Sequence, residues 1–238
     1  MIEMESMQNI KVLTSHHITD TNSYLLKTNK GFILIDTGYS THRKDLEKQL
    51  KDSGCVPGNL KLILTTHGHF DHTGNCAFLR EEYSAQIAMH KGDLQMVETG
   101  DMFYTKNILR RALGKIMVFF LMRGTFEKFT PDILIEDKYD LTPYGLEAEI
   151  VHIPGHSKGS IGILTSNNDF ICGDLLTNIK KPQKNTLIDN KEELDDSVKR
   201  IMSLEIGMVY PGHGKPFLME QFIQNNPFNC SKVPRGDG

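Results

Sequence analysis

Four side chains of the types that bind divalent metals lie within six consecutive positions. The segment THGHFDH, residues 66–72, contains His67, His69, Asp71 and His72. In an extended segment, residues two apart point to the same side, so His67 and His69 can offer their imidazoles to one metal ion. Asp71 and His72 lie beyond the bend and can face a second ion. Zinc usually takes four ligands in a tetrahedron, so one segment cannot complete two sites.

The remaining ligands must therefore come from distant parts of the sequence. Three further segments carry ligand-type residues directly after an apolar run of β type, and these are Ile153-Pro154-Gly155-His156-Ser157, Cys172-Gly173-Asp174 and Tyr210-Pro211-Gly212-His213-Gly214. A single histidine at a strand end is more often a packed or surface residue than a ligand. The ordered combination of all four segments is what favours a metal site.

The surrounding pattern predicts alternating strands and helices, as in layered α/β proteins. We expect strands at 22–27, 31–36, 60–66, 86–90, 132–135, 148–153, 160–164, 170–172 and 208–210. Helices are expected at 41–51, 75–84 and 191–204. The run LKLILTT at 60–66 is apolar almost throughout, which is typical of a strand covered on both faces, and His67 follows its carboxyl end. Ligands of α/β sheets bind at that edge.

A helical insertion is predicted at about residues 94–129, where apolar residues recur at helical spacing. Its aromatic residues Phe103, Phe119 and Phe120 would suit a lid over an apolar substrate, and a dimer surface is the alternative. The apolar run Ile116–Met122 has only seven residues, far fewer than the roughly 18 of a membrane span. A flexible tail is predicted at about 224–238, and the rest is expected to form one domain.

Composition narrows the function classes. The chain has 238 residues and a formal net charge of −3, so no overall positive field attracts nucleic acid. The amino-terminal residues MIEMESMQNI lack the basic and apolar regions of a signal peptide, which predicts a cytoplasmic location. A small-molecule substrate is therefore favoured over nucleic acid or a membrane, and a homodimer remains an alternative to a monomer.

The motifs THGHFDH, PGHS, GD and PGHG, in this order and with Asp36-Thr37-Gly38 upstream, resemble the metallo-beta-lactamase fold superfamily over about residues 10–220. The resemblance implies an α/β fold, a four-layer αββα sandwich of two mixed β-sheets flanked by helices. It also implies two zinc ions, with iron or manganese as alternatives. Its ligand pattern assigns His67, His69 and His156 to one ion, Asp71, His72 and His213 to the other, and Asp174 to both.

The resemblance further implies a metal-dependent hydrolase that uses a metal-bridging hydroxide. Asp71 would orient this nucleophile as a catalytic residue, and Asp36 would support the ligands from outside the coordination sphere. The diiron electron-transfer branch has Glu where this chain has His69, which favours hydrolysis over redox chemistry. We expect a carboxylic ester, thioester or lactone as substrate. The alternatives are a phosphodiesterase or nuclease of the same fold, and a binding or regulatory module that retains the metals.

Two observations limit the choice of substrate. Hydroxyacylglutathione hydrolases of this family carry a carboxyl-terminal helical domain, whereas only 25 residues follow His213, so glutathione thioesters are not favoured. The basic segment Lys180-Lys181-Pro182-Gln183-Lys184 follows Asp174 closely. It is interpreted as a solvated loop, with an anion clamp as the functional alternative.

Overall fold

The structure, a computed structural model, describes residues 10–16, 20–102 and 126–226. The first sheet contains, in chain order and in spatial order, β1 (Ile10–Ser15), β2 (Thr21–Thr28), β3 (Gly31–Ile35), β4 (Leu60–Leu64), β5 (Gln86–His90) and β6 (Ile133–Ile135). Strands β1 to β3 pair antiparallel, and β3 to β6 pair parallel. This sheet is therefore mixed, with its parallel strands next to the antiparallel hairpins.

The second sheet is formed by the later part of the chain. Its spatial order is β13 (Phe217–Leu218), β12 (Met208–Pro211), β9 (Asp169–Gly173), β8 (Ile161–Thr165) and β7 (Ala148–His152). Only the β12–β9 pair is parallel. A small hairpin of β10 (Leu176–Thr177) and β11 (Gln183–Lys184) follows β9.

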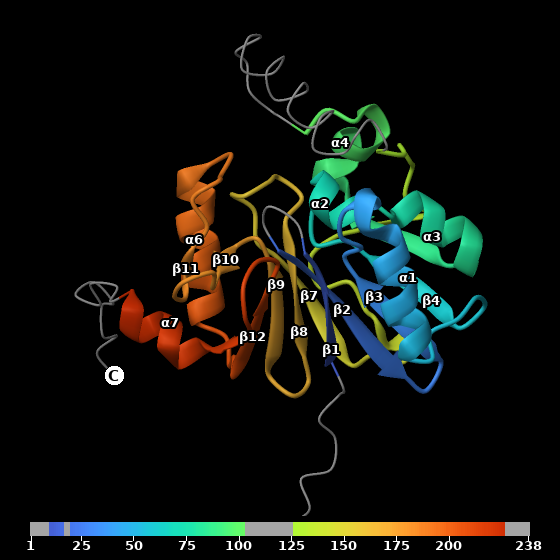
Figure 1. The fold of residues 1–238 in the computed structure, drawn as a ribbon. Helices are drawn as coiled ribbons and strands as arrows, with labels where there is room; N and C mark the ends of the chain where they lie inside the picture. Colours follow the sequence, from blue (N-terminus) through green and yellow to red (C-terminus); the bar gives the residue numbers. More distant parts are fainter. Residues whose placement is uncertain (1–9, 17–19, 103–125, 227–238) are drawn as a thin grey trace, which may run out of the picture.

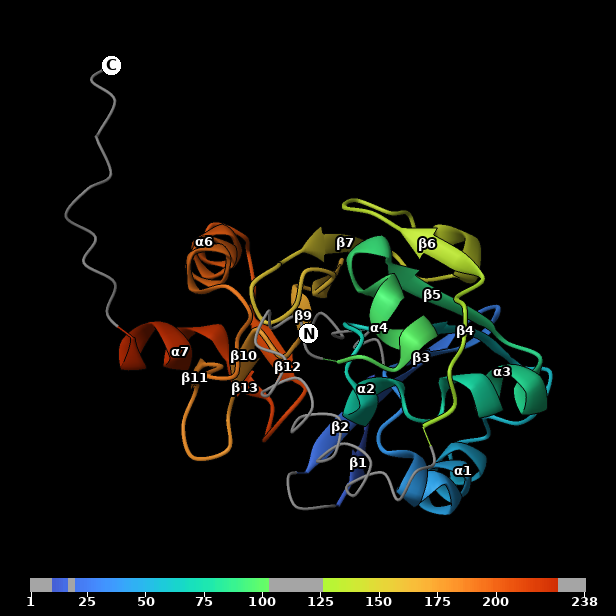
Figure 2. The ribbon, with the colours of Figure 1, turned by 90° about the horizontal axis from the view of Figure 1, so that it is seen from above.

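Helices cover the outer face of each sheet, as Figures 1 and 2 show. The helices beside the first sheet are α1 (Arg43–Asp52), α2 (Phe70–Thr73), α3 (Cys76–Tyr83) and α4 (Leu94–Thr99), and those beside the second are α6 (Lys191–Met202) and α7 (Met219–Asn225). Short 3₁₀ turns lie at Ser40–His42, Lys91–Asp93 and Thr142–Tyr144. The predicted four-layer αββα sandwich of two mixed sheets is confirmed.

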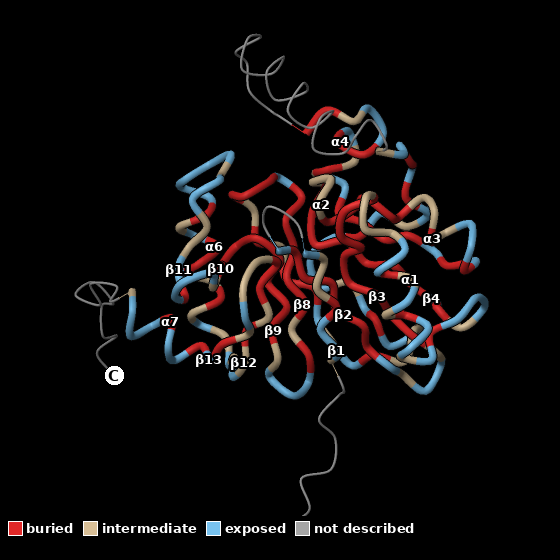
Figure 3. Tube along the Cα trace, viewed as in Figure 1, coloured by how far each residue is buried: buried red, intermediate tan, exposed pale blue. Residues whose placement is uncertain are grey.

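Strand β4 shows why its sequence is apolar almost throughout. Leu62 and Leu64 pack between the two sheets, whereas Leu60 and Ile63 pack under the helices of the first layer. All four side chains are at most 1% exposed. The buried positions of the neighbouring strands belong to the same two core clusters, and buried positions are red in Figure 3.

Helix α6 illustrates how the outer layer is specified. The Asn190 side chain accepts hydrogen bonds from the amides of Glu192 and Glu193, which caps the first turn. Acidic residues in the first turn and basic residues in the last complement the helix dipole. Leu194 and Val198 are buried against the second sheet. The sequence predicted this helix with the same first residue.

Most predicted elements occur, with ends shifted by a few residues, but β1, α7 and the short elements α2, β10, β11 and β13 were missed. Strand β1 is an edge strand whose half-exposed pattern gave no clear alternation. Helix α7 extends to Asn225, so it includes the start of the predicted flexible tail, and its Phe222 is fully buried. The remainder of that tail, residues 227–238, lies outside the described residues.

The predicted insertion is described only at its ends. Leu94–Thr99 forms α4, and Val97 and Phe129 pack into the core of the first helical layer. Residues 103–125 lie outside the described part of the chain, so Phe103, Phe119 and Phe120 remain a predicted lid. Within the described ranges, no helix is long and apolar enough to cross a membrane.

Candidate metal centre

The predicted ligands meet at one edge of the sandwich, where loops of both sheets approach each other. His67 follows β4 of the first sheet, and Asp71 and His72 lie in α2, near the upper edge in Figure 1. His156 follows β7 and Asp174 follows β9 in the second sheet. His213 follows β12. Strand ends distant in sequence thus bring all seven residues together.

His67, His69 and His156, here called the first cluster, place three ring nitrogens together. His156 Nε2 lies 3.2 Å from His67 Nε2 and 2.9 Å from His69 Nδ1. His67 and His156 are buried, and His69 is half-buried. Three imidazole nitrogens at this separation can form one face of a tetrahedral metal site.

Asp71, His72 and His213, here called the second cluster, join two imidazoles and a carboxylate. Asp71 Oδ2 lies 3.4 Å from His213 Nε2 and 3.7 Å from His72 Nε2. His72 is fully buried, whereas 15% of the Asp71 side chain and 12% of the His213 side chain are exposed. The partly exposed ligands are therefore His69 in the first cluster and Asp71 and His213 in the second.

Asp174 lies between the two clusters. Its Oδ2 atom is 3.5 Å from His156 Nε2 in the first cluster and 3.4 Å from His213 Nε2 in the second. Its Oδ1 atom is 3.5 Å from His72 Nε2. One carboxylate thus reaches ligand nitrogens of both clusters, which is the position that a bridging ligand requires.

Partners outside the clusters fix which histidine nitrogen faces inward. His72 Nδ1 pairs with Asp36 Oδ2 at 2.8 Å, His156 Nδ1 with the Leu187 carbonyl at 2.5 Å, and His213 Nδ1 with the Asp20 carbonyl at 2.7 Å. Because each of these oxygens accepts, we assign the proton to Nδ1. The Nε2 lone pairs are then free for a metal.

Asp36 lies behind the second cluster, in contact with His72. It is 1% exposed and has a positive φ of 58°, an uncommon conformation for a residue with a side chain. Its Oδ1 accepts a hydrogen bond from the Thr66 amide, and its Oδ2 accepts from the Thr66 hydroxyl, both at 2.7 Å. The same carboxylate therefore orders the start of the THGHFDH segment and orients His72.

The two clusters differ in how they hold protons. Burial and the neighbouring imidazoles lower the pKa of His67 well below its usual value and that of His69 to about 3. Burial also lowers the pKa of His72, but the charges of Asp36, Asp71 and Asp174 outweigh it and raise this pKa to about 9. His67 and His69 thus offer neutral imidazoles at pH 7, whereas a cation must displace a proton from His72.

The site meets a chemical test for a bound cation. His72 Nε2 and Asp174 Oδ1 are buried and have no hydrogen-bond partner among the described residues. Buried polar atoms without a partner are costly, and a metal ion would satisfy both. The seven donors are imidazole nitrogens and carboxylate oxygens, which zinc, iron and manganese accept to different degrees. The residues present therefore fit a dinuclear metal centre.

Other residues considered in the sequence lie elsewhere. His152 stacks on His90, with ring centroids 4.1 Å apart, and its Nε2 pairs with the Lys158 carbonyl instead of a predicted ligand. The Lys184 ammonium pairs with Asp195 at 2.6 Å. This ion pair weakens the anion-clamp alternative at that lysine.

Besides the Leu187 and Asp20 carbonyls, sequence reasoning missed Asn185 and Asp93, which contact the site from outside. The Asn185 amide donates to Asp174 Oδ2 at 3.2 Å. Asp93 is fully buried and accepts hydrogen bonds beside both His67 and His156. Neither residue belongs to a motif, and each meets its partners only through the fold.

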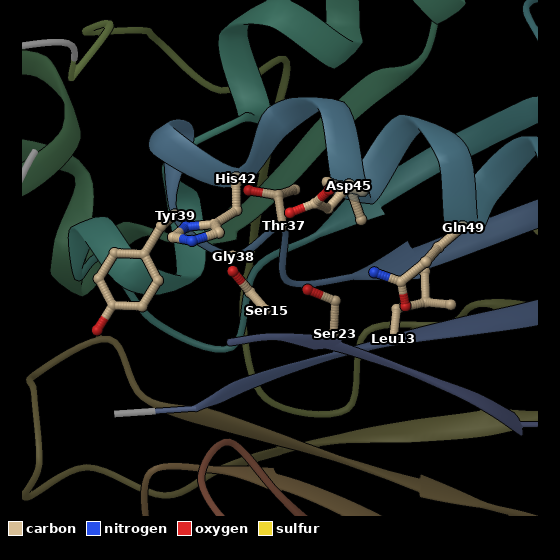
Figure 4. A pocket seen from close by; sticks show the side chains of 10 residues that line it. Leu13, Ser15, Ser23, Thr37, Gly38, Tyr39, His42, Asp45 and Gln49 are labelled. Carbon is tan, nitrogen blue, oxygen red and sulfur yellow. The ribbon is translucent and has the colours of Figure 1, made fainter. Parts of the chain in front are cut away.

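A pocket lies behind the second cluster, between β1, β2 and α1 (Figure 4). Thr37 lines this pocket, and its hydroxyl donates to the His72 carbonyl at 3.0 Å. Tyr39 also lines it and packs on Phe70. None of the predicted metal ligands lines the pocket, so we do not place the substrate there.

Comparison with known proteins places these features in a family. A family model described as the metallo-beta-lactamase superfamily matches residues 18–213. A probable metallo-hydrolase of Methanocaldococcus jannaschii is 28% identical over 199 residues, which cover 82% of this chain and 88% of that protein. The hydroxyacylglutathione hydrolase GloC of Haemophilus influenzae is 24% identical over 238 residues, covering 94% and 99%.

A solved structure agrees with this result. The crystal structure of TTHA1623 in a di-iron-bound form superposes with a TM-score of 0.70 and 27% sequence identity. The match covers 92% of this chain and 100% of that one. The similarity therefore extends over both sheets and both helical layers.

Proposed function

Because the chain belongs to the metallo-beta-lactamase superfamily and is a metal-dependent hydrolase, we propose that it holds two zinc ions and hydrolyses a carboxylic ester, thioester or lactone. The observation that carries the dinuclear part is the place of Asp174, whose Oδ2 lies 3.5 Å from a nitrogen of the first cluster and 3.4 Å from one of the second. A carboxylate so placed can bind two ions at once.

Zinc ions held by these seven residues would supply an acidified water as nucleophile and would polarise the substrate oxygen. The chain's own residues decide where substrate enters. His67, His72 and His156 are at most 3% exposed, whereas His69, Asp71 and His213 are partly exposed. Substrate therefore approaches from the side where these three ligands are partly exposed, and there the Asp71 carboxylate can orient the attacking water.

A thioester is the substrate class that we favour within this group. The sequence analysis did not favour a glutathione thioester, because only a short segment follows His213. However, a relative named hydroxyacylglutathione hydrolase aligns with this chain over 99% of its own length, so that argument against a glutathione thioester no longer holds. Leu187 is 76% exposed, and its carbonyl holds His156. This residue offers an apolar contact for an acyl group close to the first cluster.

The test combines metal analysis with a substrate panel. We expect about two zinc ions per chain by elemental mass spectrometry, and faster turnover of thioesters than of lactones, carboxylic esters, phosphodiesters and β-lactams. Asp174→Ala should lose metal and activity together. Asp52→Asn, an exposed position on α1, is the matched control and should keep both.

The other outcomes separate the alternatives. A preference for phosphodiesters would refute acyl hydrolysis and favour a nuclease. Two bound ions without turnover of any substrate would favour a binding module. One iron per chain would overturn the dinuclear zinc site. Size-exclusion chromatography of the same preparation measures the oligomeric state and so distinguishes a monomer from a homodimer.

A further inference from the structure

Asp93 connects the two loops that form the first cluster. It ends the 3₁₀ turn after β5 and is fully buried. Its Oδ2 accepts a hydrogen bond from the Gly68 amide at 2.8 Å, and Gly68 lies between His67 and His69. One Asp93 carboxylate oxygen thus holds the backbone between His67 and His69, the two ligands that follow β4 of the first sheet.

The same carboxylate holds the loop supplied by the second sheet. Asp93 Oδ2 accepts from the Ser157 hydroxyl at 2.6 Å, and Ser157 follows His156 directly. Asp93 Oδ1 accepts from the Gly159 amide at 2.7 Å. The three ligands of the first cluster come from two sheets, and Asp93 is bonded to both loops.

The segments around Asp93 lie so close together that there is no room for a Cβ atom at three neighbouring glycines. A Cβ atom at Gly159 would lie 2.7 Å from Asp93 Cγ, and one at Gly68 would lie 3.0 Å from Asp93 Cβ. A Cβ at Gly92 would lie 2.8 Å from the Gly159 amide nitrogen. Glycine at these positions lets the backbones of three segments meet, so a shift of Asp93 would move both loops.

The donor set explains why the residue is an aspartate. Two backbone amides and a hydroxyl donate to the two carboxylate oxygens, and a backbone amide cannot reverse its role. Asparagine would direct its own NH₂ group at one of these amides. The buried amide would then lose its acceptor, which is costly.

We propose that Asp93 is a positioning residue that sets the geometry of the first cluster without binding metal itself. This inference rests on the proposed dinuclear centre. His156 Nε2 lies 3.2 Å from His67 Nε2 and 2.9 Å from His69 Nδ1. These two similar distances require the His156 loop and the His67–His69 loop to be held together. Loss of the Asp93 bonds should therefore weaken the metal of the first cluster and spare that of the second.

The test is zinc affinity in Asp93→Asn, measured by competition with a chromophoric chelator. Residues that support metal ligands from outside typically change affinity by about 10- to 100-fold, and we expect a loss of this size for one ion only. Absorption spectra of the cobalt(II)-substituted variants identify which of the two ions is bound more weakly. The bands that Asp93→Asn retains should match those of His69→Ala, which lacks a first-cluster ligand. They should not match those of His213→Ala, which lacks a second-cluster ligand.

Ser157→Ala provides a second variant if Asp93→Asn does not fold. It removes one donor without reversing any other, so it should show the same loss at a smaller size. Unchanged affinities, or equal losses at both ions, would overturn the role of Asp93. The parent protein separates the two proposals, because fewer than two ions per parent chain overturns the dinuclear centre. A parent that binds no zinc overturns both.

Discussion

Replacement of Asp36 by asparagine should remove His72 as a metal ligand by reversing its tautomer. The Thr66 amide donates to Asp36 Oδ1 at 2.7 Å, so the oxygen of an asparagine side chain would stay at that position. The NH₂ group would then take the place of Oδ2 and face His72 Nδ1, now 2.8 Å away. Nδ1 would become the acceptor, and the ring proton would move to Nε2, which faces the centre.

The expected magnitude is a loss of about 10- to 100-fold in affinity for the second-cluster ion, which corresponds to about 1.4–2.7 kcal/mol. Zinc competition titrations measure this loss, and ¹⁵N NMR of the histidine rings reports the tautomer directly. Asp52→Asn is the control, because Asp52 is exposed and pairs only with Lys48 among its contacts described here. An unchanged second-ion affinity, or His72 still protonated at Nδ1, would refute the reasoning.

Three further predictions follow from the same geometry. The pKa of metal-free His72 is raised to about 9, so zinc must displace the extra proton of this ring at any lower pH. Zinc affinity should therefore rise from pH 7 towards pH 9. Calorimetry in buffers of different ionisation enthalpy should detect proton release on zinc binding at pH 7. Gly155→Ala places a Cβ 2.3 Å from the Leu194 amide nitrogen at a φ of +129°. It should lower the free energy of unfolding, measured by chemical denaturation, by at least about 1–3 kcal/mol. The control Gly207→Ala, where the nearest atom to the new Cβ is 3.7 Å away, should change the free energy of unfolding little. His152→Ala should leave the zinc content by elemental mass spectrometry unchanged, since its ring contacts His90 and Lys158.

The positions of the candidate ligands could be predicted because they follow strand ends. THGHFDH comes after the apolar strand β4, and His156, Asp174 and His213 each come after another strand. In a layered sandwich such ends collect at one edge, so residues far apart in sequence become neighbours. The pairing of particular ligands with each ion came from the family resemblance, not from the spacing.

The support around the ligands could not be predicted in the same way. Asp93 is one acidic residue in a short turn, and two of its three donors are backbone amides, which leave no mark on the sequence. Leu187 and Asp20 act through their carbonyl groups, so any residue type could serve there. Helix α7 was missed because a polar carboxyl-terminal sequence gave no sign that Phe222 is buried.

The two supporting aspartates answer different needs of the two clusters. In the first cluster, burial lowers the pKa of His67 and His69, so few protons compete for these two rings, and its weak point is the meeting of two loops from two sheets. Asp93 joins those loops. The second cluster is rich in negative charge, so its weak point is the extra proton that His72 retains on Nε2 below about pH 9. Asp36 keeps the other ring proton on Nδ1, so the Nε2 lone pair faces the metal position once the extra proton has left. The first cluster therefore depends on loop geometry, and the second depends on tautomer control.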